Sequence, residues 1–358
     1  MSSLSREKVL DALTRVIDPE LNRNLVELGM VRQVEIEGPR VRVQLALTFA
    51  GCPLKDQIVA EAKEAVARLE GVEEVLVELT EMSDEERRRI GIAGRQGVAE
   101  HLNKISHVVA IMSGKGGVGK SFVAALLAVS LRELGQAVGI LDADITGPSI
   151  PKIFGLKARP AGSPQGILPV ETRTGIKIMS VNLLLSDEDQ AVIWRGPLIS
   201  AVIRQFWGDV LWGKLDWLVV DLPPGTSDAS LTVMQSLPLS GVVLVSSPQD
   251  LAEMVVRKAA RMAQRMAVPI LGLVENMSYF VCPDSKRPYE IFGPSRGEAM
   301  AARLGVPFLG SLPLDPRVAA LSDSGEIESF PTEDFRAVAR RLIQESPPSR
   351  FSPVQPKR

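Results

Sequence analysis

The chain has 358 residues, of which 45% are hydrophobic and 23% charged, and its formal net charge is −2. This length exceeds what one ordinary hydrophobic core serves, so we expect two domains of a folded globular protein. The near-neutral charge excludes the strong basic field of a protein that binds nucleic acid or an anionic membrane.

The cysteine content and the hydropathy pattern bear on the compartment. Two cysteines are too few for a disulfide framework, which indicates a reducing environment. The N-terminal residues carry charges in place of the apolar core of a signal peptide, and no apolar run reaches the ~18 residues that a membrane span needs. We therefore expect a cytoplasmic protein whose partners include neither nucleic acid nor a membrane.

Residues 1–85 are predicted to form a small α+β domain. Its predicted elements, in chain order, are a helix over residues 5–17, strands over 31–37 and 40–49, a helix over 53–69 and a strand over 72–80. Residues 40–49 alternate strictly between polar and apolar side chains, which is typical of a half-buried strand. Gly38-Pro39 predicts the turn of a hairpin before it.

A linker is predicted over residues 86–103. Ser83 and Glu86 have the spacing of a capping box, at the start of a short helix that carries three consecutive arginines. These arginines could form a nucleic-acid patch, but the glutamates beside them favour a solvated helix end. The glycine-rich residues 91–97 follow, and the hydropathy pattern changes after them.

Residues 104–346 are predicted to form an α/β domain. Short continuous apolar runs, separated by helix-length segments, cover residues 107–113, 137–144, 215–224, 241–248, 270–277 and 306–314. Strands that are apolar on both faces and alternate with helices indicate a mostly parallel sheet covered by helices on both faces. Ligands in such folds bind at the carboxyl ends of the strands. The proline-rich residues 347–358 are predicted to be a disordered tail.

A phosphate loop follows the first apolar run. Gly114, Gly119, Lys120 and Ser121 satisfy G-x-x-x-x-G-K-S/T between a strand and a helix. Backbone N–H groups and the helix N-terminus would bind phosphate, Lys120 would neutralise charge, and the Ser121 hydroxyl would bind Mg²⁺. The strand–helix context disfavours a glycine-rich turn without a ligand. The predicted ATP-binding residues of this segment are Gly114, Lys115, Gly116, Gly117, Val118, Gly119, Lys120, Ser121 and Phe122.

Lys115 is a second lysine inside this loop, where an ordinary phosphate loop needs none. Held beside one nucleotide, it could reach a neighbouring nucleotide and stabilise charge there in trans. The alternative is a solvated surface lysine.

Acidic residues follow two other predicted strands. Asp142 and Asp144 come after the second apolar run, and Asp221 ends the third. One carboxylate at such a strand end can hold the Mg²⁺ shell, and another can orient the attacking water. Capping of the following helix is the alternative for each aspartate, and for Asp142 in particular it stays open. Residues 223–225, Pro-Pro-Gly, fit a loop that senses the γ-phosphate.

The stretches GKGGVGKS, DADITGPSIP, DLPPGTSD and ENMSYFVCP together resemble the Mrp/ApbC group of iron–sulfur cluster carrier ATPases. That group belongs to the deviant-Walker P-loop class, with MinD, ParA and the nitrogenase iron protein. The resemblance covers residues 104 to 345. In DPELNRNLVELGMV and TFAGCP, the first 85 residues resemble the small domain that is often fused ahead of bacterial Mrp proteins and occurs in iron–sulfur assembly factors.

This resemblance implies a homodimer and a set of catalytic roles. Lys115 would contact the nucleotide of the partner subunit. Lys120 and Ser121 would bind phosphate and Mg²⁺. Asp144 would help to activate water, and Asp221 would lie in the metal shell.

The resemblance also implies a base site and a cluster site. Asn276 would contact adenine, and the loop with Pro313 and Asp315 would flank the base. In the family, a Cys-x-x-Cys pair from each subunit holds an iron–sulfur cluster at the interface. Here Cys282 fills the first position of that pair, and Ser285 replaces the second cysteine.

Cys282 and Cys52 are the candidate cluster ligands. Two copies of Cys282 near a dimer axis would hold a 2Fe–2S or 4Fe–4S cluster only incompletely, so a serine oxygen, an exogenous thiol or a recipient protein would complete it. The alternative for Cys282 is a small apolar residue in a loop. Cys52 precedes Pro53 at a predicted helix N-terminus, which favours the thiolate. It could supplement or receive from the Cys282 site, or it could be inert.

We therefore predict a homodimeric ATPase that carries iron–sulfur clusters to apoproteins, with recipient proteins and an assembly scaffold as partners. ATP binding would close the dimer and hydrolysis would reopen it. A MinD/ParA-like positioning switch is the alternative, but MinD-like proteins need a basic amphipathic terminal helix and this tail is proline-rich. A small-molecule kinase is a third possibility, and it would not need Lys115.

Overall fold

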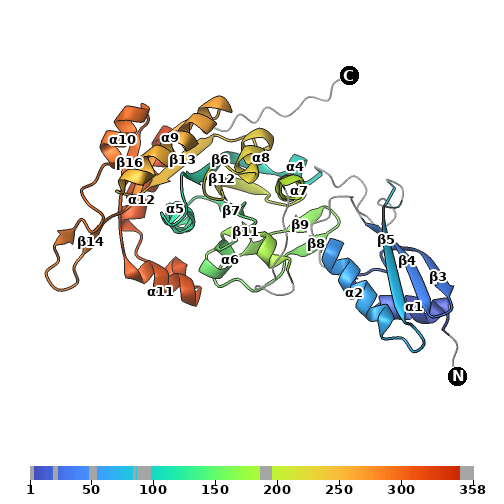
Figure 1. The fold of residues 1–358 in the computed structure, drawn as a ribbon. Helices are drawn as coiled ribbons and strands as arrows, with labels where there is room; N and C mark the ends of the chain where they lie inside the picture. The colour runs from blue at the N-terminus through green and yellow to red at the C-terminus, as the bar shows by residue number, and fades with distance from the viewer. Residues whose placement is uncertain are drawn as a thin grey trace, which may run out of the picture. The chain divides into compact units, whose positions relative to one another are not determined.

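The computed structural model describes residues 4–18, 23–47, 55–83, 86, 98–185 and 196–346 (Figure 1). The chain divides into two compact units. The first comprises Met1–Glu100, Pro160–Leu168 and Leu184–Leu211, and the second comprises His101–Arg159, Pro169–Leu183 and Trp212–Arg358.

The first unit contains a three-stranded sheet and two helices at the start of the chain. Its elements there are α1 (Arg6–Leu13), β3 (Val31–Glu37), β4 (Arg40–Leu47), α2 (Lys55–Ala67) and β5 (Glu74–Glu81). β3 and β4 pair antiparallel across a turn in which Gly38 has a φ of 62°, and β4 pairs parallel with β5. Val41, Val43 and Leu45 are buried, as the alternation predicts. Phe49, on the same predicted face, lies outside the described residues.

The first helix is shorter than the hydrophobic pattern predicts. α1 ends at Leu13 with Thr14 as its C-cap, and Ile17–Asp18 (β1) pairs antiparallel with Arg23–Asn24 (β2). The prediction of a helix up to residue 17 was therefore wrong. The tail of that segment contains β-branched residues, which favour extended backbone.

Short elements of the first unit also come from later in the chain. They are β8 (Ala161–Ser163), β9 (Gly166–Leu168) and α7 (Gly196–Gly208). β8 and β9 form an antiparallel hairpin. In the segment predicted as a linker, Val98–Leu102 forms the short helix α4, while the glycine-rich residues 91–97 lie outside the described residues.

The described part of the second unit is built on a nine-stranded sheet, in the order β10-β11-β7-β12-β6-β13-β14-β15 with β16 also paired to β14. The parallel strands are β6 (Lys104–Ser113), β7 (Val138–Asp142), β11 (Lys177–Met179), β12 (Lys214–Asp221), β13 (Gly241–Ser246), β14 (Ile270–Val281) and β16 (Phe308–Pro313). β10 (Val170–Glu171) and β15 (Pro288–Tyr289) pair antiparallel at the two ends. The predicted α/β class and the six predicted strands are thus confirmed.

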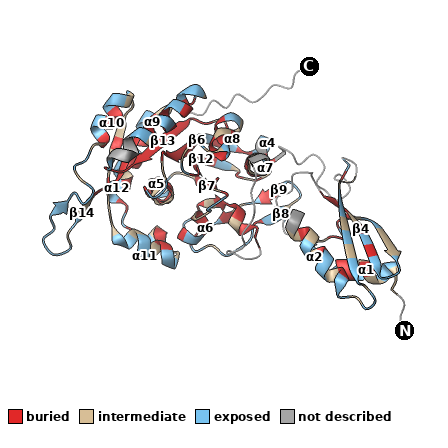
Figure 2. Ribbon diagram, viewed as in Figure 1, coloured by how far each residue is buried: buried red, intermediate tan, exposed pale blue. Residues whose placement is uncertain are grey.

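Helices cover both faces of this sheet. The helices that follow the phosphate loop in this unit are α5 (Lys120–Glu133), α6 (Ile150–Ile153), α8 (Asp228–Ser236), α9 (Asp250–Arg265), α10 (Gly297–Leu304), α11 (Pro316–Ser324) and α12 (Glu333–Glu345). α5 and α12 pack together on one face, and α9 and α10 on the other (Figure 1). Figure 2 shows buried central strands beneath helices whose outer sides are exposed. No helix in the described part of the chain is long and apolar enough to cross a membrane.

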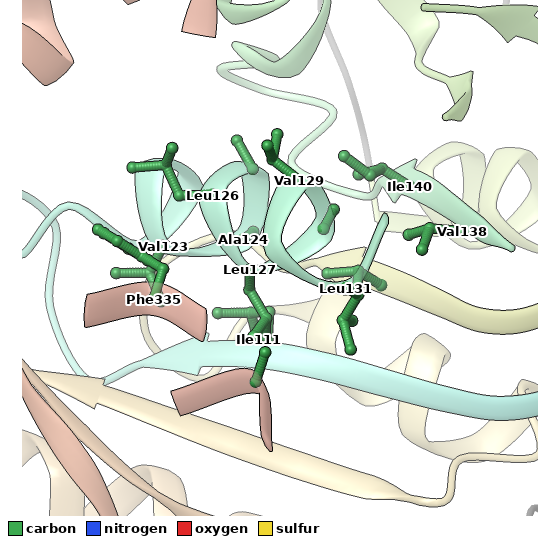
Figure 3. Packing of buried hydrophobic residues seen from close by; sticks show 14 of the residues in the cluster. Ile111, Val123, Ala124, Leu126, Leu127, Val129, Leu131, Val138, Ile140 and Phe335 are labelled. Carbon is green, nitrogen blue, oxygen red and sulfur yellow. The ribbon is translucent and has the colours of Figure 1, made fainter. Parts of the chain in front are cut away.

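α5 forms the centre of the hydrophobic core. Its residues from Val123 to Leu131 are all buried. Figure 3 shows Leu127 directed toward Ile111 of β6, and Val123 close to Phe335 of α12. Burying each such side chain contributes about 1.5–3 kcal/mol. This packing fixes α5, at whose N-terminus the phosphate loop ends.

Candidate functional site

The phosphate loop connects β6 to α5, and three of its four glycines, Gly114, Gly117 and Gly119, are required by the backbone geometry. Gly117 and Gly119 have φ angles of 80° and 76°, which L side chains rarely adopt. A Cβ on Gly114 would lie 2.4 Å from the backbone carbon of Val255 in α9. Gly119 is also the N-cap of α5 and offers no side chain there, so the helix N-terminus stays open toward the loop.

The sheet register brings the acidic strand ends together. β12 lies between β6 and β7, so Asp221 pairs with Ile111 on one side and with Asp142 on the other. Both aspartates are fully buried. Parallel strands end at the same edge of a sheet, which is why residues far apart in the sequence meet beside the phosphate loop.

Lys120 and Asp221 form a close buried ion pair through Nζ and Oδ1. Lys120 Nζ also donates to the hydroxyl of Ser121 at 3.2 Å. The second carboxylate oxygen of Asp221, Oδ2, is buried and has no hydrogen-bond partner among the described residues. Burial raises the pKa of Asp221 above its usual value, while the charge of Lys120 acts in the opposite direction.

The unpartnered oxygen of Asp221 is the feature that fits a cation. A buried carboxylate oxygen without a partner is costly unless something else binds it. The Ser121 hydroxyl and Asp221 Oδ1 both accept a hydrogen bond from the ammonium group of Lys120, so these two oxygen atoms lie close together. Oxygen donors of this kind suit Mg²⁺, which usually keeps several waters and takes only a few protein ligands.

Asp142 has a different environment from Asp221. Its Oδ1 accepts from the Asp144 backbone N–H at 3.2 Å, and its Oδ2 accepts from the Ile150 N–H at 3.3 Å and the Ser180 hydroxyl at 3.1 Å. Burial, and then the charge of Asp221, raise the pKa of Asp142 well above its usual value. These contacts match the capping alternative, because they hold the start of α6.

Asp144 lies half-buried in the loop between β7 and α6. Its Oδ1 accepts from the Thr146 hydroxyl at 3.1 Å and from the Gly147 N–H at 3.2 Å. The Asp142 carboxylate fixes the backbone of Asp144 itself. The side chain therefore has a defined position in which it lines the pocket described next.

A pocket of about 420 Å³ opens above the phosphate loop. This volume falls in the range of small-molecule sites. Residues 113 and 115–122 line it, together with Asp144, Ser149, Lys152, Ile153, Pro224, Met277, Ser322 and Asp323. The sequence motifs do not predict the lining residues from α6 and α11. The α6 residues follow Asp144 closely in the sequence, which could have indicated them, but no motif marks the α11 residues.

Lys115 is held by its own chain. Its Nζ donates to Oε1 of Gln249, the N-cap of α9, at 2.5 Å. Its carbonyl oxygen accepts from the Ser113 hydroxyl at 3.0 Å. Lys115 thus makes its contact within its own chain, and its contact with a second nucleotide stays a prediction.

The residues predicted to surround the base have other contacts in this structure. Asn276 is buried, and its Nδ2 donates to the carbonyl oxygen of Val118 at 2.9 Å. Asp315 caps α11 by accepting from the Arg317 N–H at 2.9 Å, and hydrogen bonds from the Arg317 guanidinium hold the pKa of Asp315 below its usual value. Neither Asp315 nor Pro313 belongs to the pocket lining, and contact with the base stays a prediction for all three.

β14 bends where it meets the phosphate loop. Its register with β16 shifts between Glu275 and Tyr279, and Met277 in this bulge has a φ of 57°. Such bulges are common beside functional sites, where they redirect a side chain. Met277 consequently lines the pocket, while the strand continues outward to Cys282.

Cys282 lies at the start of the turn that joins β14 to β15. Its N–H donates to the Arg287 carbonyl at 3.0 Å. Hydrogen bonds from the Ser285 hydroxyl and then from the N–H groups of Ser285 and Asp284 lower the pKa of the Cys282 thiol. No cluster of three or more His, Cys, Asp or Glu residues suited to a metal occurs among the described residues. Cys52 lies outside them.

Comparison with protein families accounts for most of the chain. Residues 104–345 match the family described as NUBPL iron-transfer P-loop NTPase, and residues 6–77 match the family described as iron-sulfur cluster assembly protein. An iron-sulfur cluster carrier protein of Synechocystis sp. is 43% identical over 350 residues, covering 95% of this chain and 97% of the relative. One from Methanocaldococcus jannaschii is 46% identical over 253 residues, covering 69% and 87%.

Solved structures show the same fold. A nucleotide-binding protein from Archaeoglobus fulgidus, in complex with ADP, is 45% identical and superposes with a TM-score of 0.60, covering 67% of this chain and 95% of that chain. The cell division ATPase MinD of Pyrococcus furiosus is 21% identical, with a TM-score of 0.50 and coverage of 67% and 99%. The second likeness concerns the fold alone.

Proposed function

Since the chain belongs to the NUBPL iron-transfer P-loop NTPase family, we propose that it hydrolyses ATP and carries iron–sulfur clusters to apoproteins. The buried Lys120–Asp221 pair, with the unpartnered Asp221 Oδ2, is the observation that carries the ATPase part. The relative from Synechocystis sp., named as a cluster carrier and aligned over nearly the whole chain, supports the carrier part over a positioning switch.

We assign the ATP and Mg²⁺ contacts as follows. The loop N–H groups bind the phosphates, and Lys120 moves from Asp221 toward the β- and γ-phosphates. Asp221 Oδ2 and the Ser121 hydroxyl would hold Mg²⁺, which when bound would neutralise charge on the phosphates. Asp144 orients the attacking water. Asp142 keeps its hydrogen bonds to the backbone and positions Asp144.

Two subunits act together in this proposal. Lys115 leaves Gln249 and contacts the nucleotide of the partner subunit, so ATP binding closes a homodimer and hydrolysis reopens it. The cluster is the cargo, bound between two copies of Cys282 whose thiols ionise readily because Ser285 donates to them. Ligands from outside this pair complete the cluster, and Cys52 assists transfer.

The domain assignment and the setting belong to the same proposal. Residues 1–85 act as the assembly-type domain, 86–103 as the linker, 104–346 as the ATPase domain and 347–358 as the tail. The two family matches, over residues 6–77 and 104–345, support this division. We place the protein in the cytoplasm, with apo iron–sulfur proteins and an assembly scaffold as partners.

Anaerobic reconstitution with iron and sulfide tests the carrier role. Wild type should bind iron and pass it to an apo-ferredoxin, and Cys282→Ser should lose most of that iron. Ser285→Cys is the matched variant that adds a thiol, because it creates a Cys-x-x-Cys spacing with Cys282. It should retain its cluster for longer than wild type does. Equal iron binding by wild type and Cys282→Ser would mean that the cargo is held elsewhere.

Light scattering and phosphate release test the ATPase role. With ATP and Mg²⁺ the protein should shift from monomer to dimer, and Lys115→Ala should abolish both the shift and the stimulated hydrolysis. A chain that stays monomeric and hydrolyses ATP at the same rate with Lys115→Ala would contradict the trans role of this lysine. Lys157→Ala, which removes an exposed lysine outside the pocket lining, is the control.

A further inference from the structure

We propose that Lys152 is a third lysine of the nucleotide site and binds the phosphate chain from α6. The inference rests on the proposed ATPase function and deepens it, since it adds a binding residue outside the phosphate-loop motif. Lys152 lines the same pocket as Lys115 and Lys120.

The position of Lys152 is fixed by the packing of α6. Ile150 and Ile153, on either side of it, are buried in the core of the second unit. The N–H of Ile150 donates to the buried Asp142 carboxylate, which also holds the backbone of Asp144. Lys152 therefore projects from a segment that is tied to the predicted catalytic loop.

A close contact between two glycines holds the end of α6 in place. A Cβ on Gly325, at the end of α11, would lie 2.4 Å from the Cα of Gly155, and a Cβ on Gly155 would lie 2.9 Å from the Gly325 carbonyl oxygen. Both glycines have φ angles in the left-handed region, 64° for Gly155 and 74° for Gly325. The ends of α6 and α11 thus meet backbone to backbone, and this contact places both segments at the pocket.

The charges of the pocket single out Lys152 as available. Lys120 is paired with Asp221, and Lys115 with the side chain of Gln249. The ammonium of Lys152 is exposed and makes no ion pair or side-chain hydrogen bond within the part of the chain that the structure describes. A phosphate chain entering the pocket therefore meets one cation that need not first break an existing contact.

Asp323 provides an internal comparison of opposite sign. It lines the same pocket from α11 and is exposed. A carboxylate there repels phosphate, since like charges in one site disfavour each other. Removal of the Lys152 charge and removal of the Asp323 charge should therefore change phosphate affinity in opposite directions.

Calorimetric titration with ATP, ADP and AMP in the presence of Mg²⁺ tests the proposal on the full chain. Lys152→Gln should weaken ATP binding about tenfold, equivalent to about 1.4 kcal/mol, weaken ADP binding less and leave AMP binding nearly unchanged. Lys152→Arg should retain ATP affinity within about threefold. Asp323→Asn should bind ATP more tightly than wild type, and the control Lys157→Gln should match wild type.

Chemical labelling gives a second measurement that needs no variant. ATP with Mg²⁺ should slow acylation of Lys152 by an N-hydroxysuccinimide ester severalfold, relative to Lys157, as read by mass spectrometry of the peptides. Wild-type ATP affinity in Lys152→Gln, equal losses for ATP and AMP, or labelling of Lys152 that ignores ATP would each overturn the inference. Failure of the wild-type protein to bind ATP at all would instead overturn the proposed function.

Discussion

Breaking the ion pair between Lys120 and Asp221 should strongly destabilise the nucleotide-free protein. Both side chains are buried, with 6% and 0% of their surface exposed. Removal of one partner from such a pair leaves an uncompensated charge and costs about 3–5 kcal/mol. We expect Lys120→Met and Asp221→Asn each to lower the free energy of unfolding by about 3 kcal/mol, which corresponds to roughly 6–12 °C in Tm.

The double variant Lys120→Met with Asp221→Asn measures the coupling energy between the two side chains, separately from the loss that each single substitution causes. With neither charge present, the loss should fall short of the sum of the single losses by about 3 kcal/mol. Urea unfolding without nucleotide or Mg²⁺ gives the four free energies and is followed by tryptophan fluorescence, to which Trp212 and Trp217, buried in the second unit, contribute. Lys214→Met, at the exposed start of β12, is the control and should change stability by less than about 0.5 kcal/mol. Losses that add within about 0.5 kcal/mol would refute the coupling.

Three further predictions concern the loop, the thiol and the buried carboxylates. Gly114→Ala should destabilise the protein by about 1–3 kcal/mol in thermal unfolding, because its Cβ meets the backbone of α9, whereas Gly116→Ala, with its nearest neighbour at 4.0 Å, should be nearly neutral; equal effects would contradict this packing. Ser285→Ala should raise the pKa of the Cys282 thiol and slow its alkylation by iodoacetamide at about pH 7. The folded protein is labelled and then digested, and the Cys282 peptide is quantified by mass spectrometry; an unchanged rate would contradict the role of the hydroxyl. The pKa of Asp142 is raised in the folded state, so this group stabilises the fold fully when the pH is below its usual pKa of about 4, and that stabilisation is lost as the pH rises through the folded-state pKa. The free energy of unfolding of wild type should therefore fall with rising pH more steeply than that of Asp142→Asn. Parallel curves for the two proteins would contradict this prediction.

Most of the fold could be predicted because strands buried on both faces must be continuously apolar. That rule located all six long strands of the second unit and, with them, the carboxyl ends at which Asp142 and Asp221 stand. It failed for β11, whose three residues are too few to form a distinctive run. The apolar periodicity also did not predict where α1 ends, because Ile17 continues the apolar pattern of the helix while its backbone pairs as a strand.

Apart from these strand-end aspartates, the candidate site could be predicted only where a local motif exists. The phosphate loop is such a motif, and two of its glycines, Gly117 and Gly119, have the positive φ angles that favour glycine. The contact of Lys115 with Gln249 joins residues 134 positions apart, and Lys152 and Asp323 reach the pocket from separate helices. These depend on how α6, α9 and α11 pack, which no short pattern encodes.

The strand order has a consequence for synthesis of the chain. β6 and β7 follow one another in the sequence, yet neither pairs with the other, because β12 lies between them. Ribosomes therefore release two apolar strands well before the strand that joins them, and pairing of this non-local kind is slow and prone to aggregation. A nascent chain that ends before Lys214 contains the whole phosphate loop but lacks β12, the strand that joins β6 to β7 and carries Asp221. Such a chain should not bind a nucleotide.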